Sequence, residues 1–248
     1  MCIIAVKCLG SSFAPKDSIE ECIRSNPHGF GMAWNENGEV KVYKTMDPNE
    51  ALDKYVELTS TLDPRTTAFI FHARIKTDGS IKLENCHPWV HNNLAFCHNG
   101  MLRNVACRDD LTDSETFFRD YFIPAWETAG LSFAFKVAQL AVKNTNNKFA
   151  FLDGNGKVFF VTGLNGFVKE DFNERPGFRG KIYFSNTSYR PVYDHSFSQG
   201  LFARPVEVKI TGSKKELAKK SSSGGSGLPP VGYHGYKLEK NKTDGFQF

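Results

Sequence analysis

Short apolar runs and longer amphipathic segments alternate along most of the chain. Residues 67–71 are apolar, rich in aromatic and β-branched side chains, and too short for a typical helix, so they predict a buried strand. Residues 93–97 form a second short apolar run, and residues 2–7 predict a first strand. Each of these strands is followed or preceded by polar residues whose side chains could take part in binding or catalysis.

Two hairpins are predicted from glycine-containing turns. Residues 30–34 and 40–43 flank Asn37-Gly38, and another β pair flanks residues 154–156. Asn-Gly favours the tight turn that joins antiparallel neighbours. These segments therefore predict antiparallel sheet.

Helical spacing appears between the strands. Residues 17–20 resemble a capping box, and residues 47–50 (Asp-Pro-Asn-Glu) are a strong helix start, followed by apolar residues at helical spacing. Residues 131–142 place Leu131, Phe135, Ala138 and Val142 on one stripe. Strands that are apolar on both faces, with helices apolar on one face, indicate an α+β fold of stacked sheets covered by helices.

Polar motifs stand at the ends of the predicted strands, where a rigid sheet presents side chains to solvent. Arg74 follows residues 67–71, and its fork of donors suits a carboxylate, although a surface salt bridge is the simpler interpretation. Asn99 and Gly100 follow residues 93–97 and offer two donors for an oxyanion hole; an ordinary Asn-Gly turn is the alternative. Asp113 either starts a helix or holds a substrate ammonium.

Cys2 directly follows Met1. Methionine removal requires a small second side chain, and cysteine is small enough, so processing would leave Cys2 with both a thiol and a free α-amine. An α-amine has a pKa of about 7.7 to 8.0 and can accept the thiol proton near neutral pH. Processed Cys2 would therefore combine a nucleophile with its own base, although a chain can also begin with Met-Cys by chance.

The ordered set of motifs resembles the class II glutamine amidotransferases, which are N-terminal-nucleophile hydrolases. The resemblance spans Cys2 to about residue 190. It rests on Met1-Cys2, the Pro27–Trp34 segment, His72-Ala73-Arg74, Thr77-Asp78-Gly79, Asn85-Cys86-His87-Pro88, His98-Asn99-Gly100, Asp113-Ser114-Glu115 and, more weakly, Phe184-Ser185-Asn186.

The resemblance implies a four-layer αββα sandwich and a division of roles. Cys2 would attack the γ-amide of glutamine, and Asn99 with Gly100 would stabilise the oxyanion. Arg74 and Asp113 would hold the α-carboxylate and the α-amine of the substrate.

Three further residues are expected at the substrate site. Thr77 and Asp78 belong to the loop after the arginine, and His87 is expected to shape the site rather than to transfer protons. Asp78 departs from better-known members, which have histidine or glycine at that point. A carboxylate facing the pocket would favour a substrate with an additional amine or repel glutamate, whereas one facing solvent would do neither. Trp34 and Trp89 lie beside motif residues and are candidates for the pocket wall.

Composition fits one catalytic domain. The chain has 248 residues, enough to bury a large core. It shows no apolar run near 18 residues and no secretory signal at its N-terminus, so we expect a cytoplasmic protein without a membrane span. The six cysteines have no regular disulfide spacing. Cys86-His87 and Cys97-His98 invite a zinc interpretation, but adjacent strand residues point to opposite faces, so we expect neither metal nor cofactor.

The character of the sequence changes near residue 213. We predict a catalytic domain at residues 1–212 and a flexible Ser/Gly/Pro-rich tail at 213–248. The tail holds seven lysines against three acidic residues, which accounts for the whole formal charge of +4. It either solubilises the chain or docks on a partner, and nucleic-acid binding is not expected because the body has no excess charge.

Three functions remain open from the sequence. The leading hypothesis is a stand-alone glutaminase that passes ammonia to a separate acceptor enzyme. The second is an amidohydrolase acting on another γ-glutamyl or small amide compound, with water as acceptor. The third is a catalytically silent binding protein of the same fold, which the intact set of motif residues disfavours.

Overall fold

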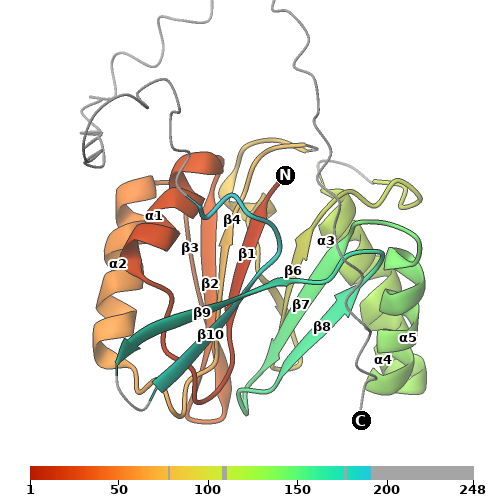
Figure 1. Cartoon of the computed structure of the whole chain (residues 1–248). Coiled ribbons are helices and arrows are strands. Elements are labelled where there is room, and N and C mark those ends of the chain that lie inside the picture. The colour runs from red at the N-terminus through yellow and green to blue at the C-terminus, as the bar shows by residue number, and fades with distance from the viewer. Residues whose placement is uncertain (78, 108–110, 176–177, 191–248) are drawn as a thin grey trace, which may run out of the picture. The chain divides into compact units, whose positions relative to one another are not determined.

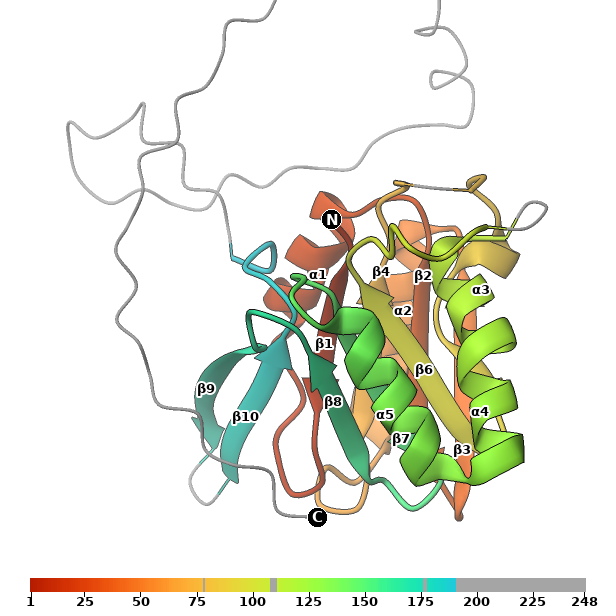
Figure 2. The same ribbon diagram turned by 90° about the vertical axis from the view of Figure 1, so that its right-hand side faces the viewer.

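Two antiparallel sheets lie face to face, and each is covered by helices on its outer side (Figures 1 and 2). The computed structural model describes residues 1–77, 79–107, 111–175 and 178–190, all within one compact unit, Met1–Tyr193. The predicted tail at 213–248 lies outside the described residues, as does the predicted boundary at 212.

The larger sheet has the strand order β3-β2-β4-β1-β10-β9, and the smaller has β5-β6-β7-β8. The strands of the larger sheet are β1 (Ile3–Lys7), β2 (Phe30–Glu36), β3 (Glu39–Thr45), β4 (Phe69–Ala73), β9 (Val168–Arg175) and β10 (Phe178–Phe184). The smaller sheet contains β5 (Trp89–His91), β6 (Leu94–Asn99), β7 (Lys148–Asp153) and β8 (Val158–Thr162). β1 thus lies between β4 and β10 in the larger sheet.

The helices fall into two groups. α1 (Lys16–Ser25) and α2 (Pro48–Thr61) cover the larger sheet. The smaller sheet is covered by α3 (Asp113–Phe117), a π-helical segment η2 (Phe118–Phe122), α4 (Ile123–Ala129) and α5 (Leu131–Val142). A short 3-10 helix, η1 (Leu83–Asn85), precedes β5.

Three layers of apolar contacts hold this arrangement together. Ile19 and Tyr55 pack on Phe71 beneath α1 and α2. Ile4 packs among small and aliphatic residues of both sheets, and a third, strongly aromatic cluster lies beneath α3 to α5. The expected αββα sandwich is confirmed by these buried layers.

Local signals predicted most of the elements. Asp47 caps α2 by accepting the backbone N–H groups of Asn49 and Glu50, and α5 has the predicted bounds. The hairpin between β2 and β3 turns through Asn37 and Gly38, both with positive φ, as the Asn-Gly pair predicts.

Two expectations about particular residues were wrong. α1 begins at Lys16 after Pro15, whose carbonyl accepts the first helical N–H groups, and no side chain caps it, so residues 17–20 form no capping box. Trp34 stacks on Phe69 in the core beneath α1 and α2 and does not wall a pocket beside the motif residues. Its position on β2 places it on the helix-facing side of the sheet.

No helix among the described residues is both long enough and apolar enough to cross a membrane. Nor does any group of three His, Cys, Asp or Glu residues in the described ranges have the spacing for a metal ion. Cys97 faces the layer between the sheets, whereas the adjacent His98 contacts Ser114 of α3, so the two side chains diverge as strand alternation predicts.

Candidate active site

Four strand ends bring the candidate residues together. Cys2 precedes β1, Arg74 follows β4, Asn99 ends β6, and Ser185 follows β10. β1 pairs with β4 so that Ile3 lies opposite Ala73, which makes Cys2 and Arg74 neighbours. A hydrogen bond between the Asn99 and Ser185 side chains joins the smaller sheet to the larger one.

The Cys2 thiol is partly buried beside the Arg74 segment. Its Sγ lies 3.5 Å from the carbonyl oxygen of Ile75. Burial raises the pKa of this thiol, and the Ile75 backbone, the positively charged chain N-terminus and Arg74 offset that rise in part. A thiol with a raised pKa is neutral at pH 7, so it needs a base before it can attack.

The Asn99 amide is buried at the end of β6. Its Nδ2 donates to Ser185 Oγ at 2.7 Å, while Oδ1 has no hydrogen-bond partner among the described residues. Ser185 Oγ also accepts the N–H of Ile4 at 2.9 Å, and its backbone N–H donates to the Ile4 carbonyl. Ser185 thus connects β1, the strand that follows Cys2, with the candidate oxyanion donor Asn99.

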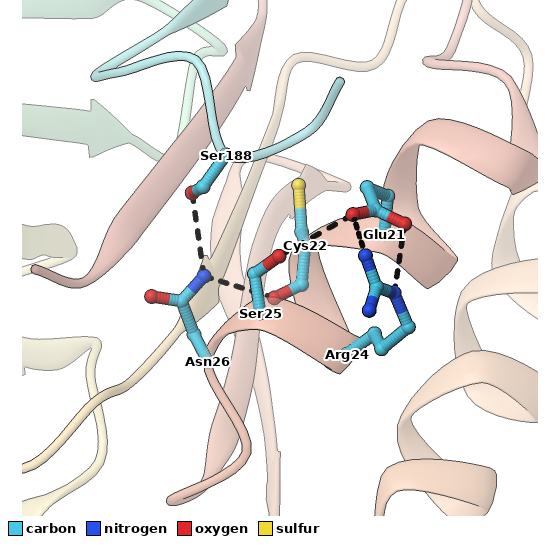
Figure 3. A network of polar contacts seen from close by, with 6 residues as sticks. All are labelled: Glu21, Cys22, Arg24, Ser25, Asn26 and Ser188. Atoms are coloured by element: carbon cyan, nitrogen blue, oxygen red, sulfur yellow. Dashed lines mark hydrogen bonds and ion pairs between the residues drawn. The ribbon is translucent and has the colours of Figure 1, made fainter. Parts of the chain in front are cut away.

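The segment after β10 also fixes the backbone of Cys2. Asn186 Nδ2 donates to the Cys2 carbonyl at 2.7 Å, and Asn186 Oδ1 accepts both the backbone N–H and the hydroxyl of Ser188. Behind it, Asn26 Nδ2 donates to Ser188 Oγ and to the Cys22 carbonyl (Figure 3). The C-terminal end of α1 therefore supports the Cys2 backbone through two intervening residues.

Position 100 requires glycine because the Asn147 side chain approaches its backbone closely. The φ of Gly100 is +144°, and a Cβ at this position would lie 1.8 Å from Asn147 Oδ1. The same Oδ1 accepts the N–H of Met101 at 2.6 Å and contacts His98 Nε2. Asn147 therefore shapes the backbone directly after Asn99, and no larger residue can replace Gly100.

Arg74 is buried and held by the loop that follows it. One guanidinium nitrogen donates to the Ser80 carbonyl at 3.0 Å, and Asn85 Nδ2 donates to the same carbonyl. Thr77 in this loop is exposed, and Asp78 lies outside the described residues. The fork of Arg74 is thus fixed beside Cys2 and not extended into solvent.

Asp113 is the first residue of α3, but its neighbour Thr112 supplies the cap by accepting the Glu115 N–H. The Asp113 carboxylate accepts the N–H groups of Leu102 and Ser114, each at 2.6 Å. It therefore anchors the segment after Gly100. A carboxylate has four lone-pair positions, so this anchoring leaves acceptor capacity for a ligand.

His87 lies against the sheet ends as a packed ring. Its centroid is 4.1 Å from His72 and 4.2 Å from Trp89, and neither ring nitrogen has a hydrogen-bond partner in the described part of the chain. Burial holds the pKa of His87 well below its ordinary value. A neutral ring in this environment supports a shaping role and not proton transfer.

Sequence reasoning gave little weight to the residues that connect the site. Ser185 and Asn186 appeared only as a weak motif, and Asn147 had no signal because it ends a polar run that looks like a loop. Their importance depends on contacts with Ile4, Cys2 and Gly100, which are distant in sequence.

Part of the chain matches a known family model. Residues 9–122 match the family model described as "Glutamine amidotransferases class-II". This span includes Arg74, Asn99, Gly100 and Asp113, whereas Cys2 precedes it. A Haemophilus influenzae protein named "Putative glutamine amidotransferase" is 29% identical over 89 residues, which cover 34% of this chain and 29% of that protein.

Solved structures with the same description are more distant. A glutamine aminotransferase class-II domain protein from Silicibacter pomeroyi is 16% identical, with a TM-score of 0.42 over 74% of this chain and 88% of that chain. The glutamine phosphoribosylpyrophosphate amidotransferase of B. subtilis, also 16% identical, has a TM-score of 0.47 over 76% of this chain and 42% of that chain. Residues 9–122, which carry Arg74, Asn99, Gly100 and Asp113, are therefore similar to the class II glutamine amidotransferases.

Proposed function

We propose that this protein hydrolyses the γ-amide of glutamine through a thioester on Cys2 and passes the ammonia to a separate acceptor enzyme. The observation that carries the proposal is the convergence of a partly buried thiol, a buried amide and a buried guanidinium at one end of the two sheets. These are the groups that acyl transfer from an amino-acid amide requires.

The base is the α-amine that Cys2 acquires when Met1 is removed. It takes the thiol proton, and the thiolate attacks the γ-carbonyl carbon. The tetrahedral intermediate collapses as the α-ammonium protonates the leaving nitrogen, so ammonia departs and a γ-glutamyl thioester remains. Water, deprotonated by the same amine, then attacks the thioester, which releases glutamate and restores the thiol.

The oxyanion is stabilised by Asn99 Nδ2 and the Gly100 N–H. Ser185 Oγ accepts the Ile4 N–H, so its own proton needs an acceptor. Turning the Asn99 amide by 180° exchanges the positions of its oxygen and nitrogen. Ser185 then donates to Oδ1, and Nδ2 takes the position of the oxygen that had no hydrogen-bond partner among the described residues. This orientation satisfies both side chains and directs a donor at the reacting carbonyl.

The α-end of the substrate is held on the other side of Cys2. Arg74 binds the α-carboxylate and Asp113 binds the α-ammonium, while Thr77 and Asp78 are further substrate-binding residues and His87 forms the packed wall behind the substrate. Opposite charges at fixed positions select an amino-acid substrate over a simple amide. We place the reaction in the cytoplasm, where the six cysteines, none of which forms a disulfide in the structure, remain reduced.

The deciding experiment treats the processed protein with 6-diazo-5-oxo-L-norleucine, a glutamine-mimicking electrophile, and locates the adduct by mass spectrometry. We expect labelling of Cys2 alone, protection by excess glutamine, and no labelling of protein that retains Met1. Cys8 is a matched control, because it is also partly exposed and its thiol pKa is also raised by burial. Equal labelling of Cys8, or none of processed Cys2, would contradict the proposal.

Transfer of ammonia is tested separately. Glutamine hydrolysis is measured with and without fractionated cell extract that lacks the protein. Stimulation that is retained by a protein fraction supports a separate acceptor enzyme, whereas an unchanged rate indicates that water and glutamine are sufficient.

A further inference from the structure

A cavity of about 710 Å³ adjoins the candidate active site at Met1 and Gly100. Residues 100–105 form one side, and the C-terminal part of α5 with residues 143–147 forms another. Gly100, a proposed oxyanion donor, lines the cavity, whereas Cys2, Asn99, Arg74 and Asp113 are not among the described residues that line it. The cavity therefore meets the site on the Gly100 side.

The position of the base decides which part of the substrate faces this cavity. The nitrogen that becomes the Cys2 α-amine is bonded to Met1 in the unprocessed chain, and Met1 lines the cavity. Because the same amine must protonate the leaving nitrogen, that nitrogen lies within hydrogen-bond reach of the amine, at the point from which Met1 extends into the cavity. Any substituent on the leaving nitrogen consequently extends into it.

The size of the cavity exceeds what glutamine needs. Ammonia is similar in size to water, which occupies about 30 Å³ in the liquid, so the cavity is roughly twenty times larger than the leaving group of glutamine. Its volume falls within the range of about 300 to 1,000 Å³ that is typical of sites for organic ligands. The space suits a leaving amine that carries its own side chain.

The residues that line the cavity indicate which substituent the leaving amine carries. Val105, Val137 and Leu140 supply apolar surface, and Arg103 and Lys143 supply positive charge. None of the described residues that line the cavity is a carboxylate. A short carbon chain ending in an anion would bury its methylene groups on the walls and present its charge to the two cations.

We infer that this cavity is a subsite for the nitrogen substituent of an N-substituted γ-glutamyl amide that ends in a carboxylate, such as a γ-glutamyl dipeptide. The inference rests on the proposed Cys2 mechanism and widens its substrate class. The Cys2 thiolate forms a C–S bond at the γ-carbonyl, the C–N bond breaks, and the α-ammonium of Cys2 protonates the departing amino acid. Water then hydrolyses the thioester, so glutamate and a free amino acid are the products.

The test uses two substrates of nearly equal size and different charge. The kcat/KM of γ-L-glutamylglycine, γ-L-glutamylglycinamide and L-glutamine is measured by glutamate release for the full processed chain. We expect γ-L-glutamylglycine to exceed γ-L-glutamylglycinamide by about tenfold, because each exposed cation contributes about threefold to fivefold. The double variant Arg103→Glu/Lys143→Glu should abolish this preference and leave glutamine hydrolysis unchanged.

Lys136→Glu is the matched control. Lys136 is an exposed residue of α5 that does not line the cavity, so its reversal should leave all three rates as they are. Hydrolysis of glutamine with no turnover of either larger amide would overturn the subsite and leave the proposed function intact. Equal use of both amides, unaffected by the double variant, would overturn the anionic class. No turnover of any substrate, together with no labelling of Cys2, would overturn both proposals.

Discussion

Polar side chains at the two ends of the sheets differ in how completely they are hydrogen-bonded. At the end of β1 remote from Cys2, Lys7 Nζ donates to the carbonyls of Cys8 and Pro64 at 3.2 and 2.7 Å and also to that of Thr67. Asn93, just before β6, uses both amide atoms, because Oδ1 accepts the Val40 N–H and Nδ2 donates to the Gly38 carbonyl. Every one of these contacts is made within the protein.

Hydrogen bonding is less complete for Asn99 and His87 at the end that carries Cys2. Asn99, at the other end of β6 from Asn93, has a buried Oδ1 with no partner in the described residues, and both nitrogens of His87 are in the same condition. Leaving a buried polar atom unpaired costs about 1 to 3 kcal/mol, so proteins rarely tolerate it without a purpose. The comparison teaches that Lys7 and Asn93 are saturated and stabilise the fold, whereas Asn99 keeps an atom unpaired in the described part of the chain, at the end where we propose that substrate binds. The Nε1 of Trp34, which is likewise unpaired among the described residues, limits this contrast to the named residues.

The largest expected effect is the loss of the nucleophile. Cys2→Ala should lower kcat for glutamine by roughly four to six powers of ten, because no other group at this position can form the thioester. The thermal midpoint of unfolding should change little, since the side chain is small and only partly buried. Normal glutamate release by this variant would remove the distinction between the two ends of β1.

Asn99→Ala tests the unsaturated amide directly. We expect kcat to fall by about two to three powers of ten while KM changes little, because the lost donor acts mainly in the transition state. Asn93→Gly is the matched control at the other end of β6, where the positive φ of Asn93 suits glycine. It should lower stability and leave kcat within about twofold of the parent. A similar loss of kcat in both variants would contradict the comparison.

Ser185→Ala should lower kcat by about tenfold to a hundredfold, because Ser185 positions the Asn99 amide through one hydrogen bond. The variant also leaves the Ile4 N–H without its acceptor, so stability will fall as well. A double-mutant cycle with Asn99→Ala separates these effects. If Ser185 acts through Asn99, it should have almost no further effect on kcat once Asn99 is alanine.

Additive losses of kcat in that cycle would show that Ser185 acts independently of Asn99. Unfolding measured in urea for all four proteins provides the structural readout. The stability loss from Ser185→Ala should persist in the Asn99→Ala background, because the Ile4 contact does not depend on the amide.

The sequence predicts those elements whose signals are local. The cap at Asp47, the Asn37-Gly38 turn and the apolar stripe of α5 each lie within a few residues of the structure they determine, and all three predictions are confirmed. Cys2, Arg74 and Asn99 were identifiable because each follows or precedes an apolar run and belongs to a motif set.

The supporting residues could not be weighed in the same way. Ser185 reaches Ile4 only because β10 pairs with β1 in a register that sets Phe184 opposite Ala5. These two strands lie near opposite ends of the described sequence. Nothing near residue 185 encodes that pairing. Asn147 is similar, since its role depends on how closely it approaches Gly100.

Lys7→Met tests the saturated end of β1. The variant removes the Lys7 donor from three carbonyls, of which that of Cys8 still accepts the Ser11 N–H, so we expect the free energy of unfolding to fall by about 1 to 3 kcal/mol. The loss is limited because burial of the charged amine, which lowers the pKa of Lys7 to about 8, already carries a cost. Steady-state kinetics should give an unchanged kcat. A fall in kcat without a loss of stability would show that this end also serves the reaction.

The smallest effect concerns the buried rings of His72 and His87 and appears as a pH dependence. Burial lowers the pKa of His72 to about 3 and that of His87 well below its ordinary value. Because the unfolded chain takes up protons near pH 6.5 that the folded rings cannot, stability is complete above that pH and is lost as the pH falls toward the folded pKa values. Each ring contributes at most about 1.4 kcal/mol per pH unit. His87→Phe should therefore reduce the slope of unfolding free energy between pH 6 and 4, as measured in urea, and an unchanged slope would show that this ring gains a partner on protonation.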